Sequence, residues 1–530
     1  MDYGTHEDNS VERVGSPDLS PNLQRAARLL ILAAIVATAA YGYFLLSPEN
    51  RGATWVWALV LVGEGLTIYQ ALGVWWTILA HDGHRDRPEV FDWRVRMLQG
   101  EDIPSIDVFV TVAGEPLELV RRTIVAARDL DLPHETWVLD DGRSDALRDL
   151  CGRLGVGYLR RPDSRHAKAG NVNAALRRTS GEFVALFDAD HVPERSFLVE
   201  ALPHLVDDGV AFVQSPQWYA NRDRLVPLGA SEAQRIFYEL VCPGKNHFNA
   251  AFCVGTNVIF RRAALAEVGG LYTDSLSEDI WTSLLLHRRG WRSVYLPKVL
   301  ARGLAPDTLA AYFKQQFRWA RGGFELLLTG RLLRGRGLTL DQRLQYLFTS
   351  TNYLLAFATV AFQLVPAAFL LSGDPPVSTD LATWLAFYVP FIVLQLLVTY
   401  LQAGGFRVAA IVTSIGVAPV HIRAFFSVLL RRRPHWSVTN TRSAIQSIEL
   451  VVPQIGLLIL NVLAIAVGVA TITPENRLGI LLAGGWAVLH SLILGRIVLE
   501  AFLDAARARR SLRRPAEDRR AGDPDLVASR

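Results

Sequence analysis

The chain has 530 residues, of which 50% are hydrophobic and 20% are charged, and its formal net charge is +4. This composition is too apolar for a wholly soluble enzyme and too polar for a chain that lies entirely in a bilayer. It therefore predicts a membrane protein that carries one sizeable soluble domain. Because the arginine clusters flank apolar segments, we interpret them as signals of membrane topology, and nucleic acid is not an expected partner.

The N-terminal part of the chain consists of a polar tail and two apolar segments. Residues 1–24 contain glycine, serine, proline and acids but little apolar surface, and they are expected to form a disordered cytosolic tail. Two transmembrane helices are expected within 25–80, because segment 29–46 carries no charge and segment 54–80 carries only Glu64. Each segment is long enough to cross about 30 Å of hydrocarbon.

Residues 81–330 show a different pattern, in which short apolar runs alternate with amphipathic stretches. The runs are rich in valine, isoleucine and phenylalanine, as is typical of buried strands. They are 106–112, 137–139, 183–187, 211–214 and 257–260. The alternation predicts a cytosolic α/β domain with a mostly parallel sheet, in which ligands bind at the carboxyl ends of the strands.

Segments long enough to span a bilayer return within 331–505. Four transmembrane helices are expected there, at 344–371, 383–403, 451–472 and 478–495. Segment 408–420 is too short to cross comfortably and runs into basic residues, so we expect an interfacial helix and a loop within 404–446. Residues 506–530 form a basic tail. With six spans, both termini and the α/β domain lie in the cytosol, as the positive-inside rule requires.

Two carboxylates follow the apolar run 183–187. Asp188 and Asp190 are one residue apart, at the expected carboxyl end of a buried strand. Hard oxygen ligands suit Mg²⁺ or Mn²⁺, and Mg²⁺ is usually held by one or two carboxylates together with substrate phosphates. The pair is therefore a candidate metal site for a diphosphate. A chance Asp-x-Asp in a surface turn is the alternative.

Three other motifs place polar side chains near the ends of predicted elements. Asp140 and Asp141 precede a glycine after the second strand, where a carboxylate could bind a base or ribose, although an ordinary Asp-Gly turn has the same sequence. Lys168 lies where a loop enters a helix, which suits either a phosphate or a solvated helix start. Glu278 and Asp279 precede a helix, so they could cap it or act as a base.

The segment 315–319 reads Gln-Gln-Phe-Arg-Trp. On a helix, Gln315, Arg318 and Trp319 share one face and offer an amide, a phosphate-binding guanidinium and a flat surface on which a sugar ring can stack. An amphipathic helix at a membrane surface could also present arginine and tryptophan.

The order of these motifs resembles that of the family 2 processive glycosyltransferases, most closely the bacterial cellulose synthases. The resemblance runs from about residue 106 to residue 322, and membrane helices follow it. It implies a UDP-sugar donor, a divalent ion (Mg²⁺ or Mn²⁺), and an α/β GT-A glycosyltransferase domain inserted in an α-helical transmembrane bundle of about six helices. The implied location is the inner or plasma membrane, with the catalytic domain in the cytosol.

The resemblance also implies roles for individual residues. The expected uridine contacts are Asp140 and Asp141, the diphosphate contacts Lys168 and Arg318, the metal ligands Asp188 and Asp190, and the other substrate contacts Glu115, Gln315 and Trp319, the last at the acceptor sugar. Asp279 would be the general base that takes the proton of the acceptor hydroxyl during a single inverting displacement.

The sequence departs from the family pattern in several places. The usual Thr-Tyr-Asn-Glu is replaced by Thr-Val-Ala-Gly-Glu at 111–115, Gln217 stands where cellulose synthases often carry histidine, and the gating-loop pattern is only approximated at 436–442. The cyclic-di-GMP-sensing β-barrel of the family has no counterpart in the sequence, so regulation by that nucleotide on this chain is not expected.

The expected function is polymerisation of a UDP-sugar, with UDP-glucose as the first candidate, into a β-linked polysaccharide such as cellulose or a related glucan, and its export. The expected partners are the donor, the growing glycan or a lipid acceptor, membrane lipids and accessory export subunits. Three alternatives remain: a lipid glycosyltransferase that makes a β-glycolipid, a hyaluronan- or poly-N-acetylglucosamine-type synthase, and a silent channel or scaffold subunit. The complete set of catalytic motifs disfavours the last.

Overall fold

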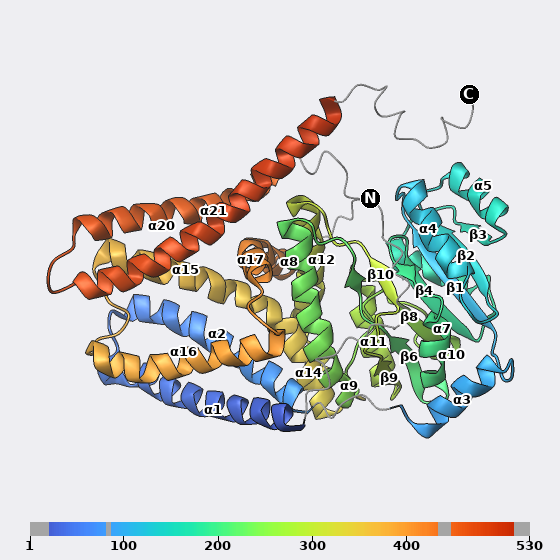
Figure 1. Ribbon diagram of the computed structural model, residues 1–530, viewed down its shortest axis with the longest axis horizontal. Helices are drawn as coiled ribbons and strands as arrows, with labels where there is room; N and C mark the ends of the chain where they lie inside the picture. Colours follow the sequence, from blue (N-terminus) through green and yellow to red (C-terminus); the bar gives the residue numbers. More distant parts are fainter. Residues whose placement is uncertain (1–20, 81–85, 433–446, 514–530) are drawn as a thin grey trace.

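The computed structural model describes residues 21–80, 86–432 and 447–513, and it has two parts (Figure 1). Long helices from both ends of the chain lie together at the left of the view, and a mixed α/β part lies at the right. The chain enters the left part first, passes through the α/β part and then returns. The soluble domain is therefore inserted between membrane segments, as the sequence predicts.

A seven-stranded sheet forms the centre of the α/β part, in the order β3-β2-β1-β4-β8-β6-β9. The strands are β1 (Ile106–Val112), β2 (Glu135–Asp140), β3 (Gly157–Arg160), β4 (Phe183–Asp188), β6 (Val210–Gln214), β8 (Val258–Arg261) and β9 (Arg292–Tyr295). Only β8 runs antiparallel to its neighbours, β4 and β6. The mostly parallel sheet is confirmed, and all five predicted strands form.

Helices cover both faces of this sheet. They are α3 (Pro88–Leu98), α4 (Leu117–Arg128), α5 (Asp145–Leu154), α6 (Ala167–Leu176), α7 (Phe197–Ala201), α10 (Arg262–Glu267) and α11 (Glu278–Arg288). Successive side chains of β1 enter different cores, because side chains alternate along a strand. Val108 and Val110 pack with Ile124 of α4, whereas Phe109 packs with Val172 of α6. The sheet is thus buried on both faces, which explains its apolar runs.

A small second sheet lies beside the large one and was not predicted. It has the order β5-β10-β7 and consists of β5 (Val192–Pro193), β7 (Trp218–Tyr219) and β10 (Ala301–Gly303). The chain between these sheets and the membrane helices forms α8 (Leu225–Ile236), a π-helical turn at Phe237–Val241, α9 (Cys242–His247), α12 (Leu309–Leu328) and α13 (Arg331–Arg334).

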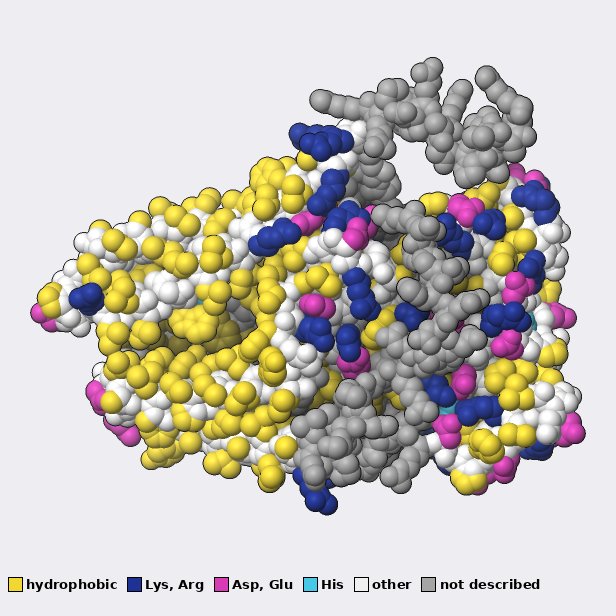
Figure 2. Space-filling view, in the orientation of Figure 1, with side chains coloured by type: hydrophobic (Ala, Val, Ile, Leu, Met, Phe, Trp, Pro, Cys, Tyr) yellow, Lys and Arg dark blue, Asp and Glu magenta, His cyan; other side chains and the backbone are white. Residues whose placement is uncertain are grey.

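Seven helices within the described ranges are long and apolar enough to cross a membrane. The bundle contains α1 (Pro21–Leu46), α2 (Thr54–Leu79), α14 (Leu340–Thr351), α15 (Leu355–Ser372), α16 (Leu381–Ala403), α17 (Val408–Leu429), α19 (Ser447–Leu450), α20 (Val452–Ala470) and α21 (Arg477–Arg513). Their outward side chains are largely hydrophobic, as the yellow surface at the left of Figure 2 shows. This chain is therefore a membrane protein.

Helix α17 corrects one expectation from the sequence. Segment 408–420 was expected to be too short to cross a membrane, but α17 has 22 residues because the helix continues through His421 and Arg423 to Leu429. In Figure 1 it is seen nearly end-on, whereas α1, α2, α16 and α20 run across the view. Its direction therefore differs from that of the other long helices. This orientation favours the interfacial position, which stays a prediction.

Three further boundaries differ from the expected ones. Helix α1 begins at Pro21, inside the tail that was expected to end at residue 24, and α21 continues to Arg513, inside the expected basic tail. The predicted span 344–371 consists of α14 and α15, which a short 3₁₀ turn at Asn352–Leu354 separates. The gating-type segment 436–442 lies outside the described residues.

Candidate active site

The carboxyl ends of three neighbouring strands bring the predicted acidic motifs to one edge of the sheet. In the parallel register, Val112 of β1 pairs with Asp140 of β2, and Thr111 of β1 pairs with Asp188 of β4. Because parallel strands end at the same edge, the acids that follow β2 and β4 face one region. This register brings together motifs that lie far apart in the sequence.

Asp188 lies in a network of charged and polar groups. Its carboxylate accepts a hydrogen bond from Thr111 Oγ1 at 3.1 Å and pairs with the Lys168 ammonium. Burial alone would raise the pKa of Asp188, but the charges of Lys168 and His191 outweigh it and lower this pKa below its ordinary value. Asp188 is therefore held as a carboxylate, the form in which it can bind a cation.

Asp190 and His191 complete a small group of possible metal ligands. Oδ1 of Asp190 lies 2.9 Å from Nδ1 of His191, and ligand atoms of Asp188, Asp190 and His191 all lie within 4.8 Å of one another. Two carboxylates so close together fit a hard divalent ion such as Mg²⁺ or Mn²⁺. No role was predicted for His191, although its position directly after the Asp-x-Asp was a usable signal.

Lys168 lies in the first turn of α6, as predicted. Besides pairing with Asp188, its ammonium donates a hydrogen bond to the Gly255 carbonyl at 2.6 Å. Burial alone would lower the pKa of Lys168, but the nearby charges of Asp188 and Glu278 raise it above its ordinary value. Lys168 is thus a half-buried cation beside the candidate metal ligands, which suits a diphosphate contact.

Asp140 and Asp141 are both engaged by the protein itself. The Asp140 carboxylate is 1% exposed and accepts hydrogen bonds from the backbone N–H of Arg143 and Ser144, at 2.9 and 2.8 Å, and from the Tyr158 hydroxyl at 2.8 Å. These contacts favour the turn alternative for the Asp140 side chain. Asp141 makes a bidentate pair with a guanidinium, that of Arg161, with both N–O distances 2.6 Å. The uridine contacts stay a prediction.

Glu115 lies close to the candidate metal ligands. One of its carboxylate oxygens accepts a hydrogen bond from the Ala113 N–H at 2.6 Å. Burial raises the pKa of Glu115, and the charges of Asp190 and Asp188 raise it further. The structure thus places Glu115 among the acids of this site, and its role as a substrate contact stays a prediction.

Glu278 and Asp279 are the first two residues of α11, directly after Ser277. Oδ1 of Asp279 accepts a hydrogen bond from the Ile280 N–H at 2.8 Å. Burial and the charge of Asp279 raise the pKa of Glu278 to about 7, and burial also raises the pKa of Asp279 against the opposing effects of the Ile280 N–H and Arg318. Raised carboxyl pKa values in a cavity are typical of a general base.

The face of α12 that carries the predicted substrate-binding motif is turned toward this acid pair. Trp319 and Gln315 line a cavity together with Asp279, whereas Arg318 is not among the lining residues. The Gln315 Oε1 atom is buried and has no hydrogen-bond partner among the described residues, and its Nε2 donates to the Tyr219 hydroxyl at 3.5 Å. An unpaired buried acceptor of this kind is available to a ligand hydroxyl.

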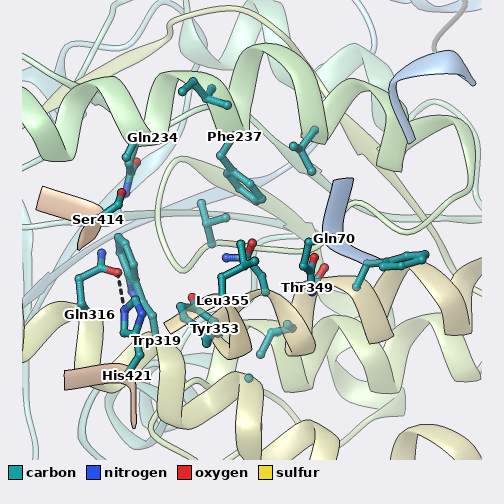
Figure 3. A pocket seen from close by; sticks show the side chains of 18 of the residues that line it. Gln70, Gln234, Phe237, Gln316, Trp319, Thr349, Tyr353, Leu355, Ser414 and His421 are labelled. Atoms are coloured by element: carbon teal, nitrogen blue, oxygen red, sulfur yellow. Dashed lines mark hydrogen bonds between the residues drawn. The ribbon is translucent and has the colours of Figure 1, made fainter. Parts of the chain in front are cut away.

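The cavity has a volume of about 560 Å³ and is lined both by Asp279 and by residues of the membrane helices. Figure 3 shows part of its lining. Its lining residues from the membrane helices include Gln70 and Thr77 of α2, Leu355 and Thr359 of α15, and Ser414 and His421 of α17. In Figure 3, Gln316, Trp319 and His421 lie together at one end, and Gln316 and His421 are 3.3 Å apart. Gln217, one of the departures from the family pattern, also lines this cavity.

A buried lysine in the cavity wall was missed from the sequence. Lys245 of α9 is 3% exposed, and its ammonium donates hydrogen bonds to both the backbone and the side-chain oxygen of Gln345, each at 3.0 Å. Gln345 in turn donates to Thr77 Oγ1 at 2.9 Å. Burial lowers the pKa of Lys245 to about 7. Lysine is rare in this chain, which has only three others, and this rarity was a possible signal.

Comparison with known proteins agrees with this geometry. The family model described as "Glycosyltransferase like family 2" matches residues 104–322, and the one described as "Cellulose synthase" matches residues 266–408. A cellulose synthase catalytic subunit (UDP-forming) of Pseudomonas fluorescens is 37% identical over 320 residues, which are 58% of this chain and 43% of that protein. The corresponding subunit of Xanthomonas axonopodis is 42% identical over 253 residues, 46% of this chain and 35% of that protein.

These relatives are considerably longer than the matched region, so this chain spans less than half of each of the two. Among solved structures, a mannosyltransferase from Pyrobaculum calidifontis aligns over 76% of this chain and 100% of its own, with 18% identity and a TM-score of 0.47. The sheet, the acidic motifs and the two family models together confirm the predicted GT-A type domain set in a helical membrane bundle. Residues 104–322 therefore form a family 2 glycosyltransferase domain, within a chain that is similar to bacterial cellulose synthase catalytic subunits.

Proposed function

We propose that this chain polymerises a UDP-sugar, with UDP-glucose as the first candidate, into a β-linked polysaccharide and moves the product across the membrane. The observation that carries the proposal is that one cavity of about 560 Å³ is lined both by Asp279 and Trp319 and by Gln70 and Thr77 of a membrane helix. A product formed beside Asp279 can enter this space directly. A soluble acceptor would need no such passage.

The donor would be held by charges at the ends of the strands. Asp188 and Asp190, with His191 beside them, would hold Mg²⁺ or Mn²⁺, and Lys168 and Arg318 would bind the diphosphate. A divalent ion bound there would supply charge stabilisation for the diphosphate as it leaves. The identity of the sugar would depend on contacts along the cavity, which include Gln217.

Asp279 would act on the acceptor. It would take the proton of the acceptor hydroxyl while that oxygen forms a bond to the anomeric carbon, and the bond from that carbon to the diphosphate would break with its electrons leaving on UDP. One displacement of this kind inverts the anomeric centre, so an α-linked donor gives a β-linkage. Trp319 in the same cavity would stack on the acceptor ring.

The catalytic domain would face the cytosol of an inner or plasma membrane. The cytosolic end of α21 contacts the domain directly, because the Asp504 carboxylate accepts a hydrogen bond from Leu309 N at the start of α12, at 2.7 Å. Arg507 of the same helix pairs with Asp504 at 2.8 Å. Basic residues on the domain side of the membrane satisfy the positive-inside rule. Accessory export subunits are proposed partners.

A second candidate is a lipid glycosyltransferase. Figure 2 shows a hollow among the membrane helices that is lined by hydrophobic side chains, and a lipid acceptor could approach through such a surface. The decisive experiment is to incubate purified, reconstituted protein with a panel of radiolabelled UDP-sugars and to separate products by size and by extraction into chloroform. A polymer supports the first proposal, a single extractable glycolipid the second, and no transfer at all a silent scaffold.

Replacing Trp319 with alanine should shorten or abolish the polymer. A processive enzyme must keep its acceptor between transfers, and stacking on an aromatic ring contributes about 1 kcal/mol or more to that retention. Product length is measured by gel filtration. A parallel sample is digested with a β-glycosidase to show that the product is a β-linked glycan. The control variant is Trp55→Ala. Trp55 is half-exposed at the start of α2, away from the residues of that helix that line the cavity. Unchanged product length in Trp319→Ala would contradict the stacking role.

On acidification, transfer should be lost at a higher pH than it would be if the general base were an aspartate with an ordinary pKa. A general base works only when deprotonated, and burial raises the pKa of both Asp279 and Glu278, the latter to about 7. Since the two carboxyls interact, the acidic limb of the profile belongs to the pair. We expect kcat at saturating donor to decline as the pH drops through about 7 toward 5. A flat profile over that range would contradict a base with a raised pKa.

A further inference from the structure

Arg321 is a buried cation on α12 that the mechanism above does not use. Its side chain is 7% exposed, and it lies one helical turn after Arg318 and two residues after Trp319. Its two terminal nitrogens donate hydrogen bonds, one to the end of α17 and one to the residues that follow α17, whereas Nε makes an ion pair with Glu325 that lacks the geometry of a hydrogen bond. A guanidinium is suited to such a role because its donors have a fixed geometry.

Two of these contacts join α12 to the end of α17 and to the residues that follow it. Nη1 of Arg321 donates to Ser427 Oγ at 2.8 Å, and Nη2 donates to the Arg432 carbonyl at 2.8 Å. Helix α17 also carries His421, which lies 3.3 Å from Gln316 in the cavity, near Trp319 (Figure 3). Arg321 therefore links α12, which carries Trp319, to the end of the helix that carries His421.

The third contact leads to the loop before the proposed base. Nε of Arg321 lies 2.9 Å from Oε1 of Glu325, and Oε2 of Glu325 accepts a hydrogen bond from Ser275 Oγ at 2.7 Å. Ser275 Oγ accepts one from the Ser277 N–H at 3.2 Å. Ser277 directly precedes Glu278 and Asp279, so a short series of contacts connects Arg321 to the start of α11.

The same loop packs closely on α12. Ser277 Oγ donates to the Arg318 carbonyl at 3.4 Å, and any side chain at Gly322 would occupy the space of the Ser277 side chain. The loop before the acid pair thus contacts α12 both at Gly322 and through the Glu325–Ser275 hydrogen bond. Neither contact depends on a substrate.

We infer that Arg321 is a positioning residue that fixes Asp279 and the end of α17 relative to Arg318 and Trp319. The inference rests on the proposed function, since it assigns Arg321 to the alignment of the base and the acceptor site. Removing the guanidinium would leave the half-buried Glu325 without its ion-pair partner and would release the contacts to Ser427 and Arg432. A displacement of about 1 Å at a reacting group can cost ~10²-fold in rate.

The test measures kcat, KM for the donor, UDP affinity by calorimetry and thermal stability in the full-length reconstituted protein. Arg321→Met should lower kcat by about 10²-fold with UDP affinity unchanged, because alignment and not donor binding is lost. Arg321→Lys, which keeps the charge but not the fork of donors, should recover part of kcat. The matched control is Arg121→Met, which removes an arginine from an exposed ion pair with Glu118.

Milder variants keep the test decisive if Arg321→Met does not fold. Ser427→Ala and Ser275→Ala each remove one contact of the series and should lower kcat at constant UDP affinity, and neither should add to the effect of Arg321→Met in a double variant. Wild-type kcat in these variants, or a fall in kcat that only follows lost UDP binding or lost thermal stability, would overturn the inference. If wild-type protein transfers no sugar while UDP still binds, the proposed function itself fails.

Discussion

Replacing Asp279 with asparagine should lower turnover by about 10²–10⁴-fold while UDP still binds. Asparagine keeps the shape of the side chain and can still accept the Ile280 N–H, which now donates to Oδ1 at 2.8 Å. It cannot take a proton from the acceptor hydroxyl. The loss should therefore be in kcat, measured with radiolabelled UDP-sugar, and not in UDP affinity, measured by calorimetry.

A variant from the same loop separates this role from a general effect on the loop. Asp274 is exposed and lies five positions before Asp279, so Asp274→Asn removes a carboxylate of the same segment without touching the cavity. It should keep nearly full activity. If Asp279→Asn lost UDP binding as well as turnover, the role of Asp279 would be structural, as a residue that organises the start of α11.

The sheet was predictable where its strands are long and buried on both faces. β1 and β4 are mostly apolar and are buried along nearly their whole length, so their runs are distinctive in the sequence. β3 and β9 were missed because they are short and only half-buried. The two-residue strands β5 and β7 show no periodicity at all. Their pairing with β10 depends on long-range contacts that no local pattern contains.

The membrane part shows a similar limit. Helix ends were misplaced where a helix continues past the first charged residues that follow its apolar segment. Helix α17 continues through basic residues. Helix α21 continues beyond Gly495 through Arg496, Glu500, Asp504 and Arg507. Glu500 and Asp504 are buried because they pair with these arginines. An apolar window finds the span, but it does not find where the helix ends.

The candidate site was predictable where chemistry is local. Asp188 and Asp190 are adjacent enough to be recognised together, and Gln315 and Trp319 follow helical spacing onto one cavity wall. By contrast, the partners of Asp140 and the pairing of Lys245 with Gln345 join segments far apart in the chain. Such contacts arise only from the fold, and they decide which polar side chains remain available to a ligand.

Removing divalent ions should abolish transfer, and Mg²⁺ or Mn²⁺ should restore it. Asp188, held as a carboxylate by the charges of Lys168 and His191, and Asp190 beside it offer hard oxygen ligands within 4.8 Å of each other. EDTA treatment followed by metal titration tests this with the radiolabelled transfer assay. Asp188→Asn and Asp190→Asn should each weaken Mn²⁺ binding, measured by calorimetry in the presence of UDP, and should lower transfer by at least about 10²-fold.

A second Asp-x-Asp in the same domain provides the control for these variants. Asp129 and Asp131 have the same spacing, but they are exposed and pair with Arg128 and Arg195 on the surface. Asp129→Asn and Asp131→Asn should therefore leave both Mn²⁺ binding and transfer unchanged. Full transfer in excess chelator would contradict the metal site. In that case the cations Lys168 and Arg318 would have to stabilise the leaving diphosphate without a metal ion.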